Sequence, residues 1–197
     1  TYIRKNIYAN TPNPITEGEL LLGYKTVTDS ENYPLITNSE DYIVTKYSVD
    51  TDHYGIKVIY ATIKQLDVDE DKGHTLKLLY PDNENYKVYL GEREPLLATA
   101  KAKKGKFWRF YFEFRNSFGL LESIFNAPAY TGGKPTLVDS KDISYGYGIT
   151  IHKSQGSTYD TVFVNMKDIN SNPDAIERKK LLYVALSRAS NKVYINL

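Results

Sequence analysis

The spacing of hydrophobic and polar residues separates the chain into three stretches. From about residue 18 to residue 92, short apolar runs alternate with polar residues and turn signals, which is typical of β-strands. We expect turns at 52–55 and 71–73. The expected strands are Leu20–Leu22, Tyr42–Val44, Ile56–Ile59, Leu76–Leu79 and Tyr86–Tyr89. Short strands at this spacing favour a small antiparallel barrel.

The second stretch, residues 93–136, contains an aromatic segment with two possible periods. Four aromatic residues recur at the spacing of one helix face, and they predict a helix from about residue 94 to 118. They are Phe107, Tyr111, Phe114 and Phe118. A strand stays open as the alternative, because a second set of rings alternates along the chain. That set is Trp108, Phe110, Phe112 and Phe114.

Basic residues crowd the same segment. Residues 101–115 contain six Lys or Arg residues and one Glu, in a chain whose net charge is only +1. Basic side chains among aromatic rings are typical of surfaces that bind single-stranded nucleic acid. An amphipathic helix that buries its rings and solvates its lysines gives the same pattern. We favour this second interpretation, because the aromatic stripe matches a core face.

The third stretch alternates strands with helices. Thr161–Val164 predicts a buried strand, and Lys192–Leu197 predicts a final strand. Between them, Ser171–Asp174 has the spacing of a capping box, with Pro173 in the first turn of a helix that continues to about Arg188. Strand, helix and strand in this order favour a parallel sheet, so the expected fold class is α/β.

Composition excludes several classes of protein. The chain has 197 residues, of which 41% are hydrophobic and 25% are charged, as in ordinary globular proteins. The absence of cysteine excludes disulfide scaffolds and cysteine nucleophiles, and three scattered histidines lead us to expect no metal site. No apolar run approaches the ~18 residues of a membrane span, and no signal peptide opens the sequence. We therefore expect a cytoplasmic protein without membrane contact.

Residues 132–136 read GGKPT and superficially suggest a phosphate-binding P-loop. A P-loop needs Gly-x4-Gly-Lys-Ser/Thr. Pro128 stands at the first glycine position, and Pro135 separates the lysine from the threonine. We reject this motif and expect the chain alone to bind no ATP in the usual way.

Two motifs near the end of the sequence carry the functional signal. Residues 146–160 read GYGITIHKSQGSTYD, and residues 179–189 read KKLLYVALSRA. In this order they resemble motifs V and VI in the second RecA-like domain (2A) of superfamily 1 helicases. Ile3–Tyr8 is similar to the segment after motif IV in the Dda/RecD-like group, whose members carry an SH3-like insertion (2B) between motifs IV and V. The resemblance is strong only in the last third of the chain.

This resemblance implies a domain layout and an activity. Residues 1–17 and 137–197 would form a discontinuous RecA-like domain 2A without its own P-loop. Residues 18–136 would form the inserted 2B domain, with an SH3-like barrel (18–92) and a helical and loop segment (93–136). The whole would be the C-terminal part of a monomeric ATP-dependent DNA helicase that moves 5′→3′. An N-terminal RecA-like domain would make most of the contacts to ATP and Mg²⁺. We therefore expect no ATP hydrolysis or DNA unwinding by this chain alone.

The resemblance also implies roles for individual residues. Arg188 matches the arginine finger of motif VI, whose planar guanidinium can grip phosphate oxygens bidentately. Gln155 and Gly156 match the part of motif V nearer the nucleotide. The residues that match the part nearer single-stranded DNA are Thr150, His152, Lys153 and Ser154.

Structural and functional alternatives accompany these assignments. An arginine at this place could instead bond carbonyls at a helix C-terminus. Leu182, Tyr183 and Val184 of motif VI are expected to lie in the core. The SH3-like region could be a protein-interaction or nucleic-acid-binding module that recruits replication or repair proteins. An RNA helicase of the same superfamily also stays open.

Overall fold

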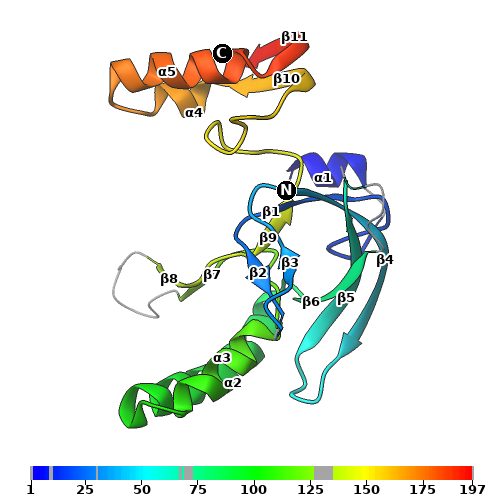
Figure 1. Cartoon of the computed structure of the whole chain (residues 1–197), viewed down its shortest axis with the longest axis vertical. Helices are drawn as coiled ribbons and strands as arrows, with labels where there is room; N and C mark the ends of the chain where they lie inside the picture. The colour runs from blue at the N-terminus through cyan, green and yellow to red at the C-terminus, as the bar shows by residue number, and fades with distance from the viewer. Residues whose placement is uncertain are drawn as a thin grey trace. The chain divides into compact units, whose positions relative to one another are not determined.

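The computed structural model describes residues 2–8, 11–29, 31–66, 68, 73–126 and 135–196. The expected turn at 71–73 and the rejected P-loop at 132–136 lie mostly outside these ranges. The chain divides into two compact units, Thr1–Tyr147 (unit 1) and Gly148–Leu197 (unit 2). Both contain helices and strands, labelled in Figure 1, so the fold is mixed α/β. None of the described helices is long and apolar enough to cross a membrane.

A five-stranded antiparallel sheet is the largest element of unit 1. Its strand order is β6-β5-β4-β1-β9. The bounds are β1 (Leu20–Gly23), β4 (Asp41–Thr51), β5 (Lys57–Gln65), β6 (His74–Leu79) and β9 (Ile143–Tyr145). Two short antiparallel pairs accompany the sheet: β2 (Val27–Thr28) with β3 (Pro34–Ile36), and β7 (Ile124–Asn126) with β8 (Thr136–Asp139). Four of the five expected strands are thereby confirmed.

The prediction of a strand at Tyr86–Tyr89 is wrong, because these residues lie in helix α2 (Asn83–Lys103). Asp82 caps this helix by accepting a hydrogen bond from the backbone N–H of Asn85 at 2.8 Å. The buried residues of the helix are Asn85, Tyr89, Arg93 and Ala100. Their spacing is helical, whereas the four residues read as a strand are too few to distinguish the two periods.

Helix α3 (Phe107–Asn116) packs beside α2 and confirms that the aromatic segment is helical. The strand alternative is therefore wrong. The predicted continuous helix from 94 to 118 is also wrong, because α2 ends at Lys103 and Lys104 follows with a positive φ of 53°. The buried rings of the predicted face are Tyr111, Phe114 and Phe118. Phe110 and Phe112 behave differently, since their exposed fractions are 51% and 49%. The core thus takes up one aromatic face of α3, and the exposed Phe110 and Phe112 flank this face on opposite sides of the helix.

A buried ion pair attaches the short helix α1 (Tyr2–Ile7) to the start of the sheet. Arg4 Nε lies 2.6 Å from Glu19 Oε1, and Arg4 Nη2 donates to Glu19 Oε2 at 3.1 Å. Glu19 also accepts from the backbone N–H of Thr16. A buried bidentate pair of this kind holds its partners in one geometry, so α1 and the strand that follows Glu19 belong to one packed unit.

Unit 2 consists of two parallel strands and two helices. Its elements are β10 (Tyr159–Asn165), α4 (Met166–Asn170), α5 (Ala175–Leu186) and β11 (Ala189–Asn196). The pairing of β10 with β11 confirms the predicted parallel sheet. The prediction that β10 is buried is wrong: within this fully described strand only Val164 is buried, and Phe163 is 77% exposed. Val162 and Val164 pack in the cluster with the helices, while Phe163 lies on the opposite face and stacks on Tyr194.

The N-cap of α5 is Asp174, so the predicted start at Ser171 lies too early. Asp174 Oδ1 accepts hydrogen bonds from the backbone N–H groups of Ile176 and Glu177 at 2.8 and 3.1 Å. Pro173 therefore precedes the cap instead of occupying the first turn. The helix also ends at Leu186, two residues earlier than expected.

We expect Asp174→Ala to weaken the first turn of α5, because N-cap replacement by alanine costs about 0.5–2 kcal/mol. Amide hydrogen exchange at Ile176 and Glu177 should then accelerate roughly 2- to 30-fold. Asp174→Asn is the matched control, since it keeps an oxygen acceptor and should exchange like the wild type. Equal exchange in all three proteins would show that this cap does not hold the helix start.

Candidate functional site

The residues that match motif V form a tight turn in unit 2. Ser154 donates its backbone N–H to the carbonyl oxygen of Thr150 at 3.1 Å, and Gln155 donates its own to that of His152 at 3.4 Å. Thr150 Oγ1 accepts from the backbone N–H of Lys153 at 3.3 Å. This acceptor role leaves the Thr150 hydroxyl proton available for an outside acceptor such as a phosphate oxygen.

Gly156 ends this turn with a φ of +90°. A side chain rarely adopts such a φ, so glycine is favoured here for its backbone conformation. Space is not the reason, because a Cβ built at Gly156 meets nothing within 4 Å among the described atoms. The backbone at Gly156 is therefore open to the approach of a ligand.

The side chains of the turn divide into two groups. Thr150, His152 and Gln155 are exposed, and Lys153 is half-buried. Ser154 is buried, and its hydroxyl donates to the carbonyl oxygen of Ile151 at 2.7 Å. Ser154 is one of the residues predicted to contact DNA, but its hydroxyl proton is already used in a hydrogen bond inside the turn.

Arg188 connects the two motifs. It follows the C-cap of α5 and directly precedes β11. Its Nη1 donates to the carbonyl oxygen of Ser157 at 3.2 Å, and its Nη2 donates to Ser187 Oγ at 3.0 Å. The carbonyl oxygen of Arg188 accepts from the backbone N–H of Tyr159 at 2.8 Å. The carbonyl that the guanidinium bonds belongs to the end of the motif V segment, and not to the last turn of α5.

One nitrogen of the same guanidinium has no partner. Arg188 Nε is buried and has no hydrogen-bond acceptor within the part of the chain that the structure describes. Buried donors are normally paired, so such an orphan requires an explanation. A planar guanidinium can bind phosphate oxygens, which are the ligand that the resemblance assigns to this residue; the buried Nε itself is closed to an incoming ligand in this conformation.

A cavity of ≈ 510 Å³ brings the motif V turn together with α5. The turn contributes His152 and Gln155 to its lining. Helix α5 contributes Glu177, Lys179, Lys180, Leu181, Tyr183 and Val184. The expectation that Tyr183 lies in the core is wrong, since its exposed fraction is 74%. The apolar run around Tyr183 contains no polar position that would have marked its outward-facing side.

Gln155 and Arg188 fit the polar part of a nucleotide. The exposed amide of Gln155 can both donate and accept hydrogen bonds, and Arg188 supplies a fixed cation. Among the described residues, no group of three His, Asp or Glu side chains gathers as a metal site. The assignment of Mg²⁺ to an N-terminal domain stays a prediction.

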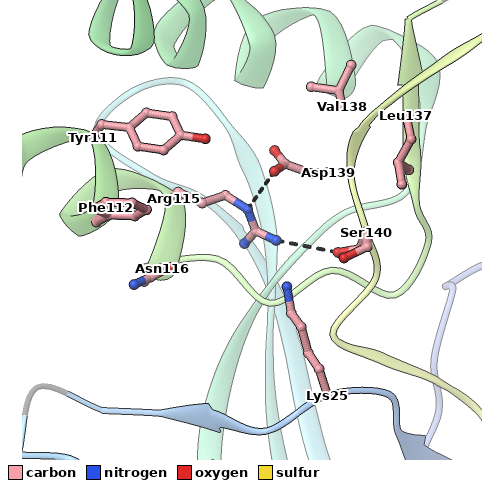
Figure 2. A pocket seen from close by; sticks show the side chains of 9 residues that line it. All are labelled: Lys25, Tyr111, Phe112, Arg115, Asn116, Leu137, Val138, Asp139 and Ser140. Atoms are coloured by element: carbon pink, nitrogen blue, oxygen red, sulfur yellow. Dashed lines mark hydrogen bonds and ion pairs between the residues drawn. The ribbon is translucent and has the colours of Figure 1, made fainter. Parts of the chain in front are cut away.

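A second cavity, of ≈ 390 Å³, lies in unit 1 between α3 and β8. Figure 2 shows the Arg115 side chain at its base, bonded to Asp139 and to the carbonyl oxygen of Ser140, with Lys25 on the opposite side. Arg115 Nε lies 3.1 Å from Asp139 Oδ1, and Lys25 Nζ lies 2.5 Å from Asp142 Oδ1. Both cations of the lining are thus neutralised by carboxylates, which indicates a structural role.

Asp139 is the centre of this buried ion network. Its other oxygen, Oδ2, lies 2.8 Å from Arg93 Nε and accepts from the Tyr89 hydroxyl at 3.1 Å. Burial alone would lower the pKa of Arg115, but the carboxylates of Asp142 and Asp139 outweigh it and raise that pKa. Sequence analysis did not identify this network, because Arg115, Arg93 and Tyr89 lie 24, 46 and 50 positions from Asp139 and form no local pattern.

Comparison with known proteins bears on unit 2. Residues 145–196 match the UvrD-like helicase C-terminal domain. This segment contains both motifs, the turn at 150–156 and Arg188. The match supports the interpretation of residues 145–196 as a superfamily 1 helicase C-terminal region.

Two relatives resemble this chain over short segments. "Uncharacterized protein R530" of Acanthamoeba polyphaga mimivirus is 52% identical over 52 residues, which are 26% of this chain and 10% of that protein. "Uncharacterized protein MJ1519" of Methanocaldococcus jannaschii is 38% identical over 58 residues, which are 29% of this chain and 5% of that protein. The matched segment therefore spans a tenth or less of each relative.

Proposed function

We propose that this chain is the C-terminal part of an ATP-dependent DNA helicase or translocase of superfamily 1, similar to the Dda/RecD-like group. One observation carries the proposal. Within the segment that matches the helicase domain, Arg188 of motif VI donates through Nη1, at 3.2 Å, to the carbonyl oxygen of Ser157, which directly follows the motif V turn. A cation in this position can contact a phosphate while it stays hydrogen-bonded to the residue that follows the turn.

The proposed roles come from the resemblance to motifs V and VI, and the geometry of the turn and of Arg188 is compatible with them. Arg188 contacts the γ-phosphate of ATP as the arginine finger, and Gln155 with the open backbone of Gly156 lies toward the nucleotide. The exposed Thr150 and His152 side chains and the Lys153 ammonium hold phosphates of single-stranded DNA. Ser154 contributes through its backbone and through the turn that its hydroxyl stabilises. One rigid turn that touches both ligands provides a physical route for coupling them.

The remaining parts of the proposal concern the whole protein. Domain 2A would combine residues 1–17 with 137–197, and 2B would span 18–136 with an SH3-like barrel; the compact units of the structure divide the chain differently, between Tyr147 and Gly148. An N-terminal RecA-like domain would bind ATP and Mg²⁺, and motion would be 5′→3′. We further propose a cytoplasmic monomer that acts with replication or repair proteins.

The test is ATP hydrolysis by the complete protein, with and without single-stranded DNA. We expect strong stimulation by DNA, and no hydrolysis by residues 1–197 alone. Lys153→Ala should raise the DNA concentration that gives half-maximal stimulation by about three- to tenfold and reduce its salt dependence, since one phosphate contact is lost.

Lys167→Ala on α4 is the matched control, because it removes an exposed lysine of unit 2 outside the turn. It should behave like the wild type. Absence of DNA-stimulated hydrolysis in the complete protein would overturn the helicase proposal. Stimulation by RNA but not by DNA would replace it with an RNA helicase.

A further inference from the structure

The last turn of α2, the residues that connect it to α3 and the first half of α3 form a basic and aromatic surface, which we call the hairpin tip. Its residues are Lys101, Lys103, Lys104, Lys106, Phe107, Trp108, Phe110 and Phe112. All four lysines are exposed, and Phe107 and Trp108 are half-buried. Phe110 and Phe112 expose about half of their surface. The interpretation of this segment as a purely core-facing helix is therefore incomplete.

Charge is concentrated at the hairpin tip. Residues 95–112 contain five basic residues and no acidic one, whereas the whole chain carries a net charge of +1. The rest of the chain is therefore net negative. Within the described ranges, no carboxylate lies within ion-pair distance of Lys101, Lys103, Lys104 or Lys106. A local positive field of this kind attracts a polyanion.

Helix stabilisation explains only part of this charge. Lys101 and Lys103 lie in the last turn of α2, where cations favour the helix dipole. Lys106 lies at the N-cap of α3, where it forms no capping hydrogen bond and a positive charge opposes the dipole. Lys104 has φ 53° and ψ −160°, a conformation that strongly favours glycine. Lys104 and Lys106 thus occupy positions whose local structure favours other residues.

The aromatic rings of the hairpin tip form two contacting pairs on different sides of α3. Trp108 stacks on Phe112 with ring centroids 5.8 Å apart and an interplanar angle of 27°. The ring centroids of Phe107 and Phe110 are 6.3 Å apart, and Lys103 Nζ lies over the Phe107 ring, 5.1 Å from its centroid. Exposed rings beside cations are the chemistry with which proteins hold unpaired bases and their phosphates.

We propose that the hairpin tip binds single-stranded nucleic acid. Lys103, Lys104 and Lys106 contact successive phosphates, and Phe110 and Phe112 stack on bases. An acidic protein segment would satisfy the lysines but would leave the rings without partners. The proposal rests on the proposed helicase function for its place in the protein, while its binding chemistry is tested by itself.

Trp108 makes the test specific to this surface, because it is the single tryptophan of the chain. The 197-residue protein is titrated with a 20-nucleotide oligo(dT) at several salt concentrations, and tryptophan fluorescence is recorded. We expect saturable quenching that weakens with salt. The triple variant Lys103→Ala, Lys104→Gly and Lys106→Ala should bind at least about tenfold more weakly, and its log–log salt slope should fall by about 2.

A matched triple variant controls for net charge. Lys46→Ala, Lys64→Ala and Lys87→Ala remove three exposed lysines of unit 1 outside the hairpin tip and should leave the titration unchanged. Phe110→Ala with Phe112→Ala tests stacking, and we expect at least about fivefold weaker binding. An abasic oligonucleotide of equal length, which keeps the phosphates and lacks the bases, should bind the wild type with a similar loss.

Each outcome decides the proposal. No quenching, or quenching that the tip and control triple variants share equally, would overturn it. Poly-glutamate that quenches as strongly as oligo(dT) would assign the surface to an acidic protein partner instead. DNA-stimulated hydrolysis by the complete protein is read separately, so failure of the hairpin tip and failure of the helicase proposal give different results.

Discussion

Replacing Arg188 by alanine in the complete protein should lower DNA-stimulated ATP hydrolysis by about 10³- to 10⁵-fold, the range expected for an arginine finger. The physical reason is the charge that develops on the transferred phosphoryl group. A guanidinium fixed at its edge by Ser157 and Ser187 reaches that charge with little reorganisation. Alanine removes the cation and leaves the backbone turn in place.

Arg188→Lys sharpens this test, because lysine keeps the charge but lacks the planar fork. We expect it to recover little of the lost rate. Lys192→Ala is the control, because it removes an exposed lysine of β11 that is not part of the cavity lining, and it should keep wild-type hydrolysis. Circular dichroism and DNA binding confirm that each variant is folded. Wild-type rates in a folded Arg188→Ala protein would contradict the assignment of the finger.

Replacing Asp139 by alanine should destabilise unit 1 by about 3–5 kcal/mol, the cost of leaving a buried charge without its partner. Asp139 lies within ion-pair distance of both Arg93 and Arg115, whose side chains are almost fully buried. It also accepts from the Tyr89 hydroxyl. Arg115 keeps the carboxylate of Asp142 as a partner at 3.5 Å. Among the carboxylates of the described residues, Arg93 keeps only that of its exposed neighbour Glu94.

Urea unfolding followed by Trp108 fluorescence measures this effect, since Trp108 lies in α3 beside the network. Asp139→Asn should reduce the free energy of unfolding nearly as much as Asp139→Ala does, because asparagine keeps the shape of the side chain and removes its charge. Glu84→Ala is the matched control: its pair with Lys87 is exposed, so its loss should change stability by at most about 1 kcal/mol. A loss below about 1 kcal/mol in Asp139→Ala would show that the network contributes little.

The two motifs of unit 2 were identified from the sequence alone, because each is a short run of adjacent residues whose spacing needs no knowledge of the fold. Four of the five strands of the sheet, all except β9, and the parallel order of β10 and β11 were also predicted correctly. Their alternating or continuous apolar runs and the turns between them are local patterns, and local patterns survive in the sequence.

Burial was decided by the tertiary structure. Tyr183 and Phe163 lie in apolar runs that suggested a core, yet both are exposed, since α5 and β10 each pack on one side only. At Tyr86–Tyr89 the capping of α2 by Asp82 outweighed a four-residue alternation. The exposed rings of α3 and the ions around Asp139 depend on contacts between distant residues. Periodicity records which residues share a face, but the elements that pack against that face determine whether it is buried.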